Sequence, residues 1–237
     1  MKSISGKTQI FGLIGKPVVQ SMSPAMHNAA FKALKLDNCY LCFLVEKHQV
    51  KKAIEGIKAL NLKGINVTTP YKQKVIPYLD EIDPIAKKIG AVNTIVNENG
   101  KLKGYNTDWL GFIHSLEKHT TLFNKNIVLL GAGGSARGIA FGLKNKGANI
   151  TILNRTISKA KKLAKEFNVN YGWLNKLNTI RGDILINSTR LGMYPCTNIS
   201  IATKKQLKKF PIVFDIVYNP IETKFLKLAK KAGCKTI

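Results

Sequence analysis

The fold of the second half of this chain is decided by the stretch Asn126-Ile-Val-Leu-Leu-Gly-Ala-Gly-Gly-Ser-Ala-Arg-Gly138. An apolar run, Ile127–Leu130, predicts a buried strand, and Gly131, Gly133 and Ala136 then fit Gly-x-Gly-x-x-Ala at the start of a helix. In this pattern the first glycine allows a tight turn, the second lets the backbone approach a pyrophosphate, and the third small residue keeps helix and strand close. The helix N-terminus then faces the phosphates with free N–H groups and the positive end of its dipole. The pattern predicts a dinucleotide-binding βαβ unit; the plain alternative is a glycine-rich turn with no ligand.

The residues after the next predicted strand indicate which dinucleotide is bound. That strand covers Asn149–Leu153 and is followed by Asn154, Arg155 and Thr156. An NAD site places an acidic residue here for the ribose 2′-hydroxyl, whereas a cation suits the 2′-phosphate of NADP. The sequence therefore predicts NADP as the cofactor.

Composition sets limits on the class of protein. The chain has 237 residues, 45% of them hydrophobic, which is enough for two modest domains with a buried core. No stretch approaches the roughly 20 apolar residues of a membrane span, and the N-terminus lacks the apolar core of a signal peptide. We therefore expect a cytoplasmic protein without a membrane partner.

The formal charge of +25 raises the question of nucleic-acid binding. Of the 38 basic residues only 4 are arginines, and the lysines are spread along the chain. Nucleic-acid binding favours clustered, arginine-rich surfaces with interleaved aromatic residues. We expect no nucleic-acid partner, and a positive field that draws in anionic substrates and cofactors.

Cys39-Tyr-Leu-Cys42 has the spacing of a metal or redox motif. No second pair stands at zinc-binding distance, the 4 histidines form no ligand pattern, and the motif lies in a strand-like run rather than at a helix start. We predict no metal site, and interpret these cysteines as buried core thiols.

Apolar periodicity and turn residues predict two α/β domains, 1–107 and 108–237, with a cleft between them as the natural active site. In the first domain we expect strands at Ile10–Ile14, Cys39–Val45, Gly64–Val67, Ala91–Val96 and Leu102–Tyr105, and helices at Pro24–Leu36, Gln49–Leu60, Pro70–Tyr78 and Pro84–Ile89. We expect Thr107 to cap a helix over Asp108–His119. In the second domain we expect strands near 126, 149, 183 and 212, and helices at Ser135–Lys146, Ser158–Phe167, Thr203–Lys209 and Ile221–Ala232.

Two polar clusters occupy predicted helix starts. Pro24 fits the first helical position, so Ser23 is the expected N-cap and Ser21 adds a second hydroxyl where a carboxylate is welcome; plain capping is the alternative. Pro70 fits the same position in the next cluster, which puts Lys72 in a first helical turn. There the dipole opposes positive charge, so the amine could exchange a proton near neutral pH; a solvated surface lysine is the alternative.

Two further clusters, Gly90-Ala-Val-Asn93-Thr94 and Gly104-Tyr-Asn-Thr-Asp108-Trp-Leu-Gly111, follow predicted strands. The chain has only 13 acidic residues, which makes Asp108 in this company notable. An acid favoured in a first helical turn is the plain alternative.

The sequence from Phe11 to Gly233 resembles the shikimate dehydrogenase family. The motifs that carry the resemblance occur in order: Ser-x-Ser-Pro-x-x-His-Asn, Asn-Val-Thr-x-Pro-x-Lys, Gly-Ala-Val-Asn-Thr, Asn-Thr-Asp-x-x-Gly, Gly-Ala-Gly-Gly, Asn-Arg-Thr, Asn-Ser-Thr-x-x-Gly-Met and Asp-Ile-Val-Tyr-Asn-Pro-x-x-Thr. The resemblance implies a substrate-binding domain, a Rossmann-like NADP-binding domain, and reversible reduction of 3-dehydroshikimate to shikimate on the route to chorismate and the aromatic amino acids. It leaves open whether two copies pair as a homodimer.

The resemblance also implies roles for individual residues. Lys72 would be the general acid–base, and Asp108 would keep it oriented and charged. The implied substrate ligands are Ser21, Ser23, Thr68, Lys72, Asn93, Asp108 and Tyr218. The implied cofactor ligands are Gly131, Ala132, Gly133, Gly134, Ser135, Asn154, Arg155, Thr156, Lys159 and Ile216.

The chain departs from the family at its end. Members usually continue into a further helical segment that carries a glycine beside the nicotinamide and a glutamine that binds the substrate. This sequence stops at Ile237, so we expect lower substrate affinity and marginal stability. The alternatives are a quinate/shikimate dehydrogenase of broader specificity, and a truncated ligand-binding form with weak turnover.

Overall fold

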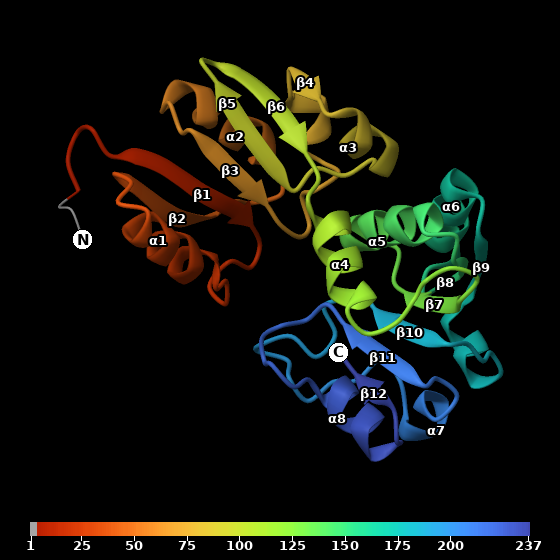
Figure 1. Cartoon of the computed structure of the whole chain (residues 1–237). Coiled ribbons are helices and arrows are strands. Elements are labelled where there is room, and N and C mark those ends of the chain that lie inside the picture. Colours follow the sequence, from red (N-terminus) through yellow and green to blue (C-terminus); the bar gives the residue numbers. More distant parts are fainter. Residues whose placement is uncertain (1–3) are drawn as a thin grey trace. The chain divides into compact units, whose positions relative to one another are not determined.

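The computed structural model describes residues 4–237, which divide into two compact units. One unit ends at Thr107, and the other comprises Asp108–Ile237. Each is built on a six-stranded sheet, and Figure 1 shows helices packed against the sheet of each unit. The predicted α/β fold class is confirmed.

The first unit contains a mixed sheet with strand order β2-β1-β3-β5-β6-β4. The β1 strand pairs in parallel with both β2 and β3, whereas β5 runs antiparallel to β3 and β6. The strands are β1 (Gln9–Gly15), β2 (Asn38–Leu44), β3 (Gly64–Val67), β4 (Glu81–Ile82), β5 (Thr94–Glu98) and β6 (Lys101–Tyr105).

Alternation along β1 gives this sheet two cores, because successive side chains of a strand point to opposite faces. Leu13 packs with buried Tyr40 on one face, while Ile14 packs with Ile65 and Val67 on the other. The helical elements that cover these faces are α1 (Ser23–Ala33), α2 (Val50–Ala59), the 3₁₀ helix η1 (Ile76–Tyr78) and α3 (Pro84–Ile89).

The helix predicted over Pro70–Tyr78 is wrong. The segment is a series of turns that ends in η1, with N–H groups of Lys74 and Val75 donating to the Tyr71 carbonyl. Pro77 has no N–H, so a continuous α-helix over 70–78 would lack one of its hydrogen bonds. Tyr71 is also buried, and its hydroxyl donates to the Val45 carbonyl at 2.7 Å. Lys72 therefore does not lie in the first turn of a helix, and no helix dipole acts on its amine.

The sequence predicted Ser23 as the N-cap of α1, and this prediction is wrong. Met22 occupies the cap position in helical conformation, so the helix begins one residue earlier and no side chain caps it. The Ser21 hydroxyl instead accepts from the Ser23 N–H at 3.2 Å.

The strand predicted over Ala91–Val96 also begins later, at Thr94, because the backbone of Val92 pairs with Lys72 rather than with a sheet neighbour.

The second unit contains an all-parallel sheet with strand order β12-β11-β10-β7-β8-β9. Its strands are β7 (Asn126–Leu130), β8 (Asn149–Asn154), β9 (Asn170–Trp173), β10 (Ile184–Asn187), β11 (Ile212–Asp215) and β12 (Lys235–Thr236). Its helices are α4 (Asp108–Glu117), α5 (Gly134–Asn145), α6 (Ile157–Phe167), η2 (Leu174–Asn178), α7 (Lys204–Leu207) and α8 (Lys224–Lys231).

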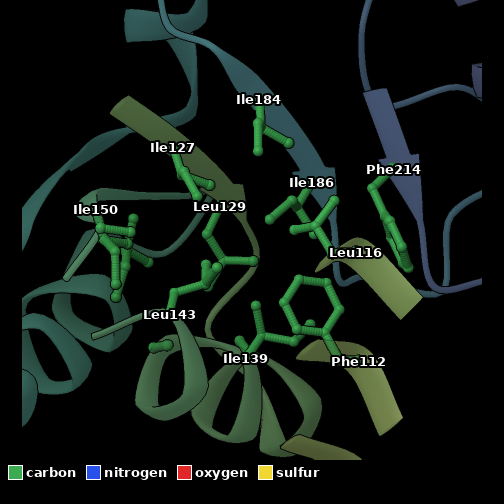
Figure 2. Packing of buried hydrophobic residues seen from close by; sticks show 14 of the residues in the cluster. Phe112, Leu116, Ile127, Leu129, Ile139, Leu143, Ile150, Ile184, Ile186 and Phe214 are labelled. Carbon is green, nitrogen blue, oxygen red and sulfur yellow. The ribbon is translucent and has the colours of Figure 1, made fainter. Parts of the chain in front are cut away.

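Both faces of this parallel sheet are buried, as its nearly unbroken apolar strands require. Leu129 of β7 and Ile186 of β10 pack against α4 and α5, where Figure 2 shows Phe112, Leu143 and their neighbours. The alternate residues of the same strands face a second core, which includes α7 and α8. The strands β4, β9 and β12 were missed in the sequence because they are short edge strands with weak patterns.

Candidate active site

The turn after β7 requires a glycine at position 131. Gly131 has φ of +112°, and a Cβ there would lie 2.6 Å from the Ser188 hydroxyl oxygen. That hydroxyl donates to the Leu130 carbonyl at 2.7 Å, so it is held in place. The end of β7 and the loop after β10 are therefore packed tightly around the turn.

Gly133 differs, because its missing side chain leaves open space. It is the N-cap of α5, and a Cβ there would meet no protein atom within 4 Å. Ala136, one turn into the helix, is fully buried against the sheet. The turn Gly131-Ala132-Gly133-Gly134-Ser135 thus forms an open cradle at a helix N-terminus, which fits a pyrophosphate.

A second loop of the same unit carries the basic residues expected to select the cofactor. Arg155, Thr156 and Lys159 are exposed at the start of α6, just after β8. The Asn154 side chain donates to the Thr156 carbonyl at 2.9 Å, which shapes the loop, and Thr156 occupies the N-cap without a side-chain capping bond. No acidic residue stands in this loop, so a guanidinium and an ammonium are available to a phosphate.

A buried network joins the loops after β10 and β11, and the sequence did not predict it. The Asp215 carboxylate accepts from the Asn187 amide at 3.0 Å, the Val217 N–H at 3.0 Å and the Thr223 hydroxyl at 2.7 Å. Asn187 and Thr223 are fully buried. The network fixes the backbone on both sides of Ile216, which is half-buried and whose N–H donates to the Asn187 carbonyl. The motifs that contain Asn187 and Asp215 were the available signal.

Burial raises the pKa of Asp215 to about 6, against the three hydrogen bonds that favour its charged form. Because the folded-state pKa lies above the unfolded one, the stability that this group contributes is full below about pH 4 and declines through about pH 6. A rise from 3.8 to about 6 corresponds to roughly 3 kcal/mol.

We therefore expect wild type to lose up to about 3 kcal/mol of unfolding free energy, relative to Asp215→Asn, between pH 4 and 7. Asparagine keeps an acceptor for Val217 and cannot ionise, so the comparison isolates this one group. Denaturant unfolding of both proteins across the pH range measures it. Parallel curves would contradict the assignment.

The first unit brings Lys72 and Asn93 together. Lys72 is the only lysine that is buried among residues 4–237, and its carbonyl accepts from the Val92 N–H at 2.7 Å. The neighbouring Asn93 is 9% exposed, and its side chain pairs with the backbone N–H and hydroxyl of Thr107, each at 2.9 Å. The surface-lysine alternative is thereby excluded for Lys72.

The other predicted residues of the first unit follow β3 or lie at the start of α1. Thr68 directly follows β3, and the Val67 N–H before it donates to the Asn93 carbonyl at 2.7 Å. Ser21 and Ser23 are half-buried at the start of α1.

Burial raises the pKa of the Cys42 thiol, which hydrogen-bonds Ser21. Cys39 and Cys42 are half-buried rather than buried.

Two predicted substrate residues belong to the second unit. Asp108 is the first residue of α4 and directly follows Thr107. Tyr218 is 60% exposed, three residues after β11.

Neither a metal-binding cluster nor a membrane-spanning helix occurs in the described range 4–237. No group of three or more His, Cys, Asp or Glu side chains there could hold a metal ion. No helix within that range is long and apolar enough to cross a membrane.

Comparison with known proteins gives a consistent result for both units. A family model described as the shikimate dehydrogenase substrate binding domain matches residues 13–95, and one described as shikimate / quinate 5-dehydrogenase matches residues 115–231. The shikimate dehydrogenase (NADP(+)) of Methanococcus maripaludis is 47% identical over 244 residues, which cover 99% of this chain and 87% of the relative. That of Bacillus cereus is 48% identical over 234 residues, covering 95% and 84%.

The solved structures that this chain matches carry the same description as these relatives. The chain matches a crystal structure of a shikimate dehydrogenase in complex with NADP⁺ with a TM-score of 0.90 and 46% identity, covering 99% of this chain and 85% of that one. It matches shikimate 5-dehydrogenase of Thermus thermophilus, in complex with NADP(H) and shikimate, with a TM-score of 0.86 and 33% identity, covering 97% and 87%. This chain belongs to the shikimate dehydrogenase family.

Proposed function

We propose that this chain catalyses the reversible NADPH-dependent reduction of 3-dehydroshikimate to shikimate, on the route to chorismate and the aromatic amino acids. The observation that carries the proposal is the burial of Lys72, which alone among the lysines of residues 4–237 is withdrawn from solvent. A buried ammonium that is held by its backbone can meet a reacting oxygen in a fixed geometry, which a surface lysine cannot do.

The second unit supplies the cofactor site. NADPH, when bound, supplies the hydride. Gly131–Ser135 would cradle its pyrophosphate, because the open space at Gly133 and the start of α5 admit a phosphate. Asn154, Arg155, Thr156 and Lys159 would hold the 2′-phosphate, and Ile216 would line the nicotinamide pocket.

The first unit supplies most of the substrate site. Ser21 and Ser23 would hold the substrate carboxylate, with Tyr218 of the second unit as a further ligand. Thr68 and Asn93 would bind the ring hydroxyls, and Asn93 is already oriented by its two bonds to Thr107.

Lys72 would perform the proton transfer. Reduction of the ketone places negative charge on the carbonyl oxygen, and a positioned ammonium neutralises it by giving up one proton from Nζ. In the oxidation direction the neutral amine takes the proton back. We assign Asp108 to keep Lys72 charged and oriented, since Asp108 directly follows Thr107, which Asn93 binds.

A second candidate is a quinate/shikimate dehydrogenase of broader specificity, because the family model that matches residues 115–231 covers both activities. Steady-state reduction of 3-dehydroshikimate and 3-dehydroquinate by NADPH separates the two. We expect a much larger kcat/KM for 3-dehydroshikimate. Comparable values would favour the broader enzyme, and no turnover of either would favour a ligand-binding form.

We further propose that two copies pair through the exposed apolar side chains of α1 and β2. Met26 and Leu44 are 60% and 59% exposed, and β2 carries no charged residue in a chain of charge +25. Light scattering that gives about 52 kDa, twice the 26.2 kDa of one chain, would support the homodimer. A mass of one chain would contradict the homodimer.

The cytoplasmic location stays a prediction.

A further inference from the structure

The α1 helix begins at Ser23, directly after Ser21 and Met22, and it packs on the core through the partly buried Phe31 rather than through a fully buried side chain. The α1 helix has no buried residue, unlike α2 with Val50, Ile54 and Ile57. Burial of apolar surface is the usual force that docks a helix onto a sheet. Polar contacts and a ring stack therefore add to this limited packing in fixing where the two serines lie.

Those contacts converge on Tyr40 of the edge strand β2. The Asn28 amide donates to the Tyr40 carbonyl at 2.9 Å, and its oxygen accepts from the Tyr40 N–H at 2.8 Å. The Asn28 side chain thus makes the two backbone hydrogen bonds that a further strand would make with Tyr40 at this edge of the sheet. The His27 ring stacks on the Tyr40 ring with centroids 4.3 Å apart and planes 15° apart. Burial lowers the pKa of His27, which favours the neutral ring in this stack.

Tyr40 in turn connects to the part of the site that contains Asn93. Tyr40 is 3% exposed, and its hydroxyl donates to the Asn66 side-chain oxygen at 2.7 Å. The Asn66 amide donates to the Asn93 carbonyl at 3.3 Å and to the Thr94 hydroxyl at 3.2 Å. The Thr94 hydroxyl donates to the Asn93 side-chain oxygen at 3.0 Å. An unbroken set of contacts therefore runs from α1, across β2 and β3, to Asn93.

We propose that Tyr40, clamped by His27 and Asn28, is a positioning residue that sets the separation between the carboxylate-binding serines and Asn93. A rigid substrate that is held at both ends binds well only when the two ends are correctly spaced. Tyr40 would act on substrate affinity without touching the substrate, the cofactor or the transferred proton. This inference rests on the proposed function, which assigns the serines and Asn93 to the substrate.

Tyr40→Phe is the sharpest test, since it removes the hydroxyl bond to Asn66 and keeps both the stack and the Asn28 pairing. We expect the KM for shikimate to rise about five- to tenfold, the usual effect of one lost hydrogen bond. The kcat and the KM for NADP should stay within twofold of wild type. Asn28→Ala, which releases α1 from Tyr40, should raise the same KM at least as much.

Asn97→Ala is the matched control for Asn28→Ala. Asn97 is a buried amide of the same unit, and it bonds the backbone of Leu62 and Gly100 towards the other end of β5 from Asn93. This variant should lower the melting temperature and leave the KM for shikimate unchanged.

An unchanged KM for shikimate in Tyr40→Phe would overturn the inference, as would an equal rise in Asn97→Ala. If Tyr40→Phe fails to fold, the comparison of Asn28→Ala with Asn97→Ala decides the question alone. A wild-type protein that does not turn over shikimate would instead reject the proposed function.

Discussion

Replacing Lys72 with alanine is expected to lower kcat by about 10²- to 10⁴-fold, the range for loss of a general acid–base. Lys72 is the buried amine of the first unit, and its backbone is tied to Val92 beside Asn93. Alanine leaves the nascent alkoxide without a proton donor, so the loss falls on kcat rather than on cofactor binding. NADP affinity, measured by fluorescence titration, should stay within twofold.

Lys74→Ala is the matched control for this experiment. Lys74 lies two residues further along the same turns, but its side chain is exposed. Its removal should leave kcat unchanged and show that loss of one positive charge from this segment is not the cause. Full activity in Lys72→Ala would refute the proton-transfer assignment.

Replacing Arg155 with alanine is expected to lower kcat/KM for NADP by about 10- to 100-fold, the usual value of a charge-assisted bond. The expected cause is loss of the guanidinium at the start of α6, where the sequence has no acid that would suit NAD. The kcat/KM for NAD should change by less than about threefold, because NAD lacks the 2′-phosphate.

Arg181→Ala provides the control for the Arg155 variant, since Arg181 is also exposed and lies in the same unit. Arg181→Ala should lower neither the kcat/KM for NADP nor that for NAD. This result would separate recognition of the 2′-phosphate by Arg155 from the general positive field of the chain. An equal fall for NADP and NAD in Arg155→Ala would contradict the 2′-phosphate assignment.

The parts of the fold that the sequence predicted well are those decided by neighbouring residues. Glycines 131 and 133 and the apolar strand before them are local signals, and they lie at the turn between β7 and α5. The Pro84–Ile89 helix also has its predicted bounds, because Asp83 caps it through the N–H groups of Ile85 and Ala86.

The failures come from contacts between distant residues. The Pro70–Tyr78 helix gives way to turns that bury Tyr71 against Val45, a residue 26 positions away. Position alone favoured a surface interpretation of Lys72, and its burial depends on packing that no local pattern reveals. The network around Asp215 likewise joins residues up to 28 positions apart. Local signals predicted the candidate residues, whereas long-range packing determines how they lie in the fold.

Hydride transfer from NADPH to the carbonyl carbon of 3-dehydroshikimate is the step on which the proposed function depends. The most direct measurement uses NADPH deuterated at the transferred position of nicotinamide C4 and mass spectrometry of the product. We predict shikimate that carries one deuterium per molecule, formed in a one-to-one ratio with the NADPH consumed. Shikimate without deuterium, or no NADPH consumption above the uncatalysed rate, would contradict the account.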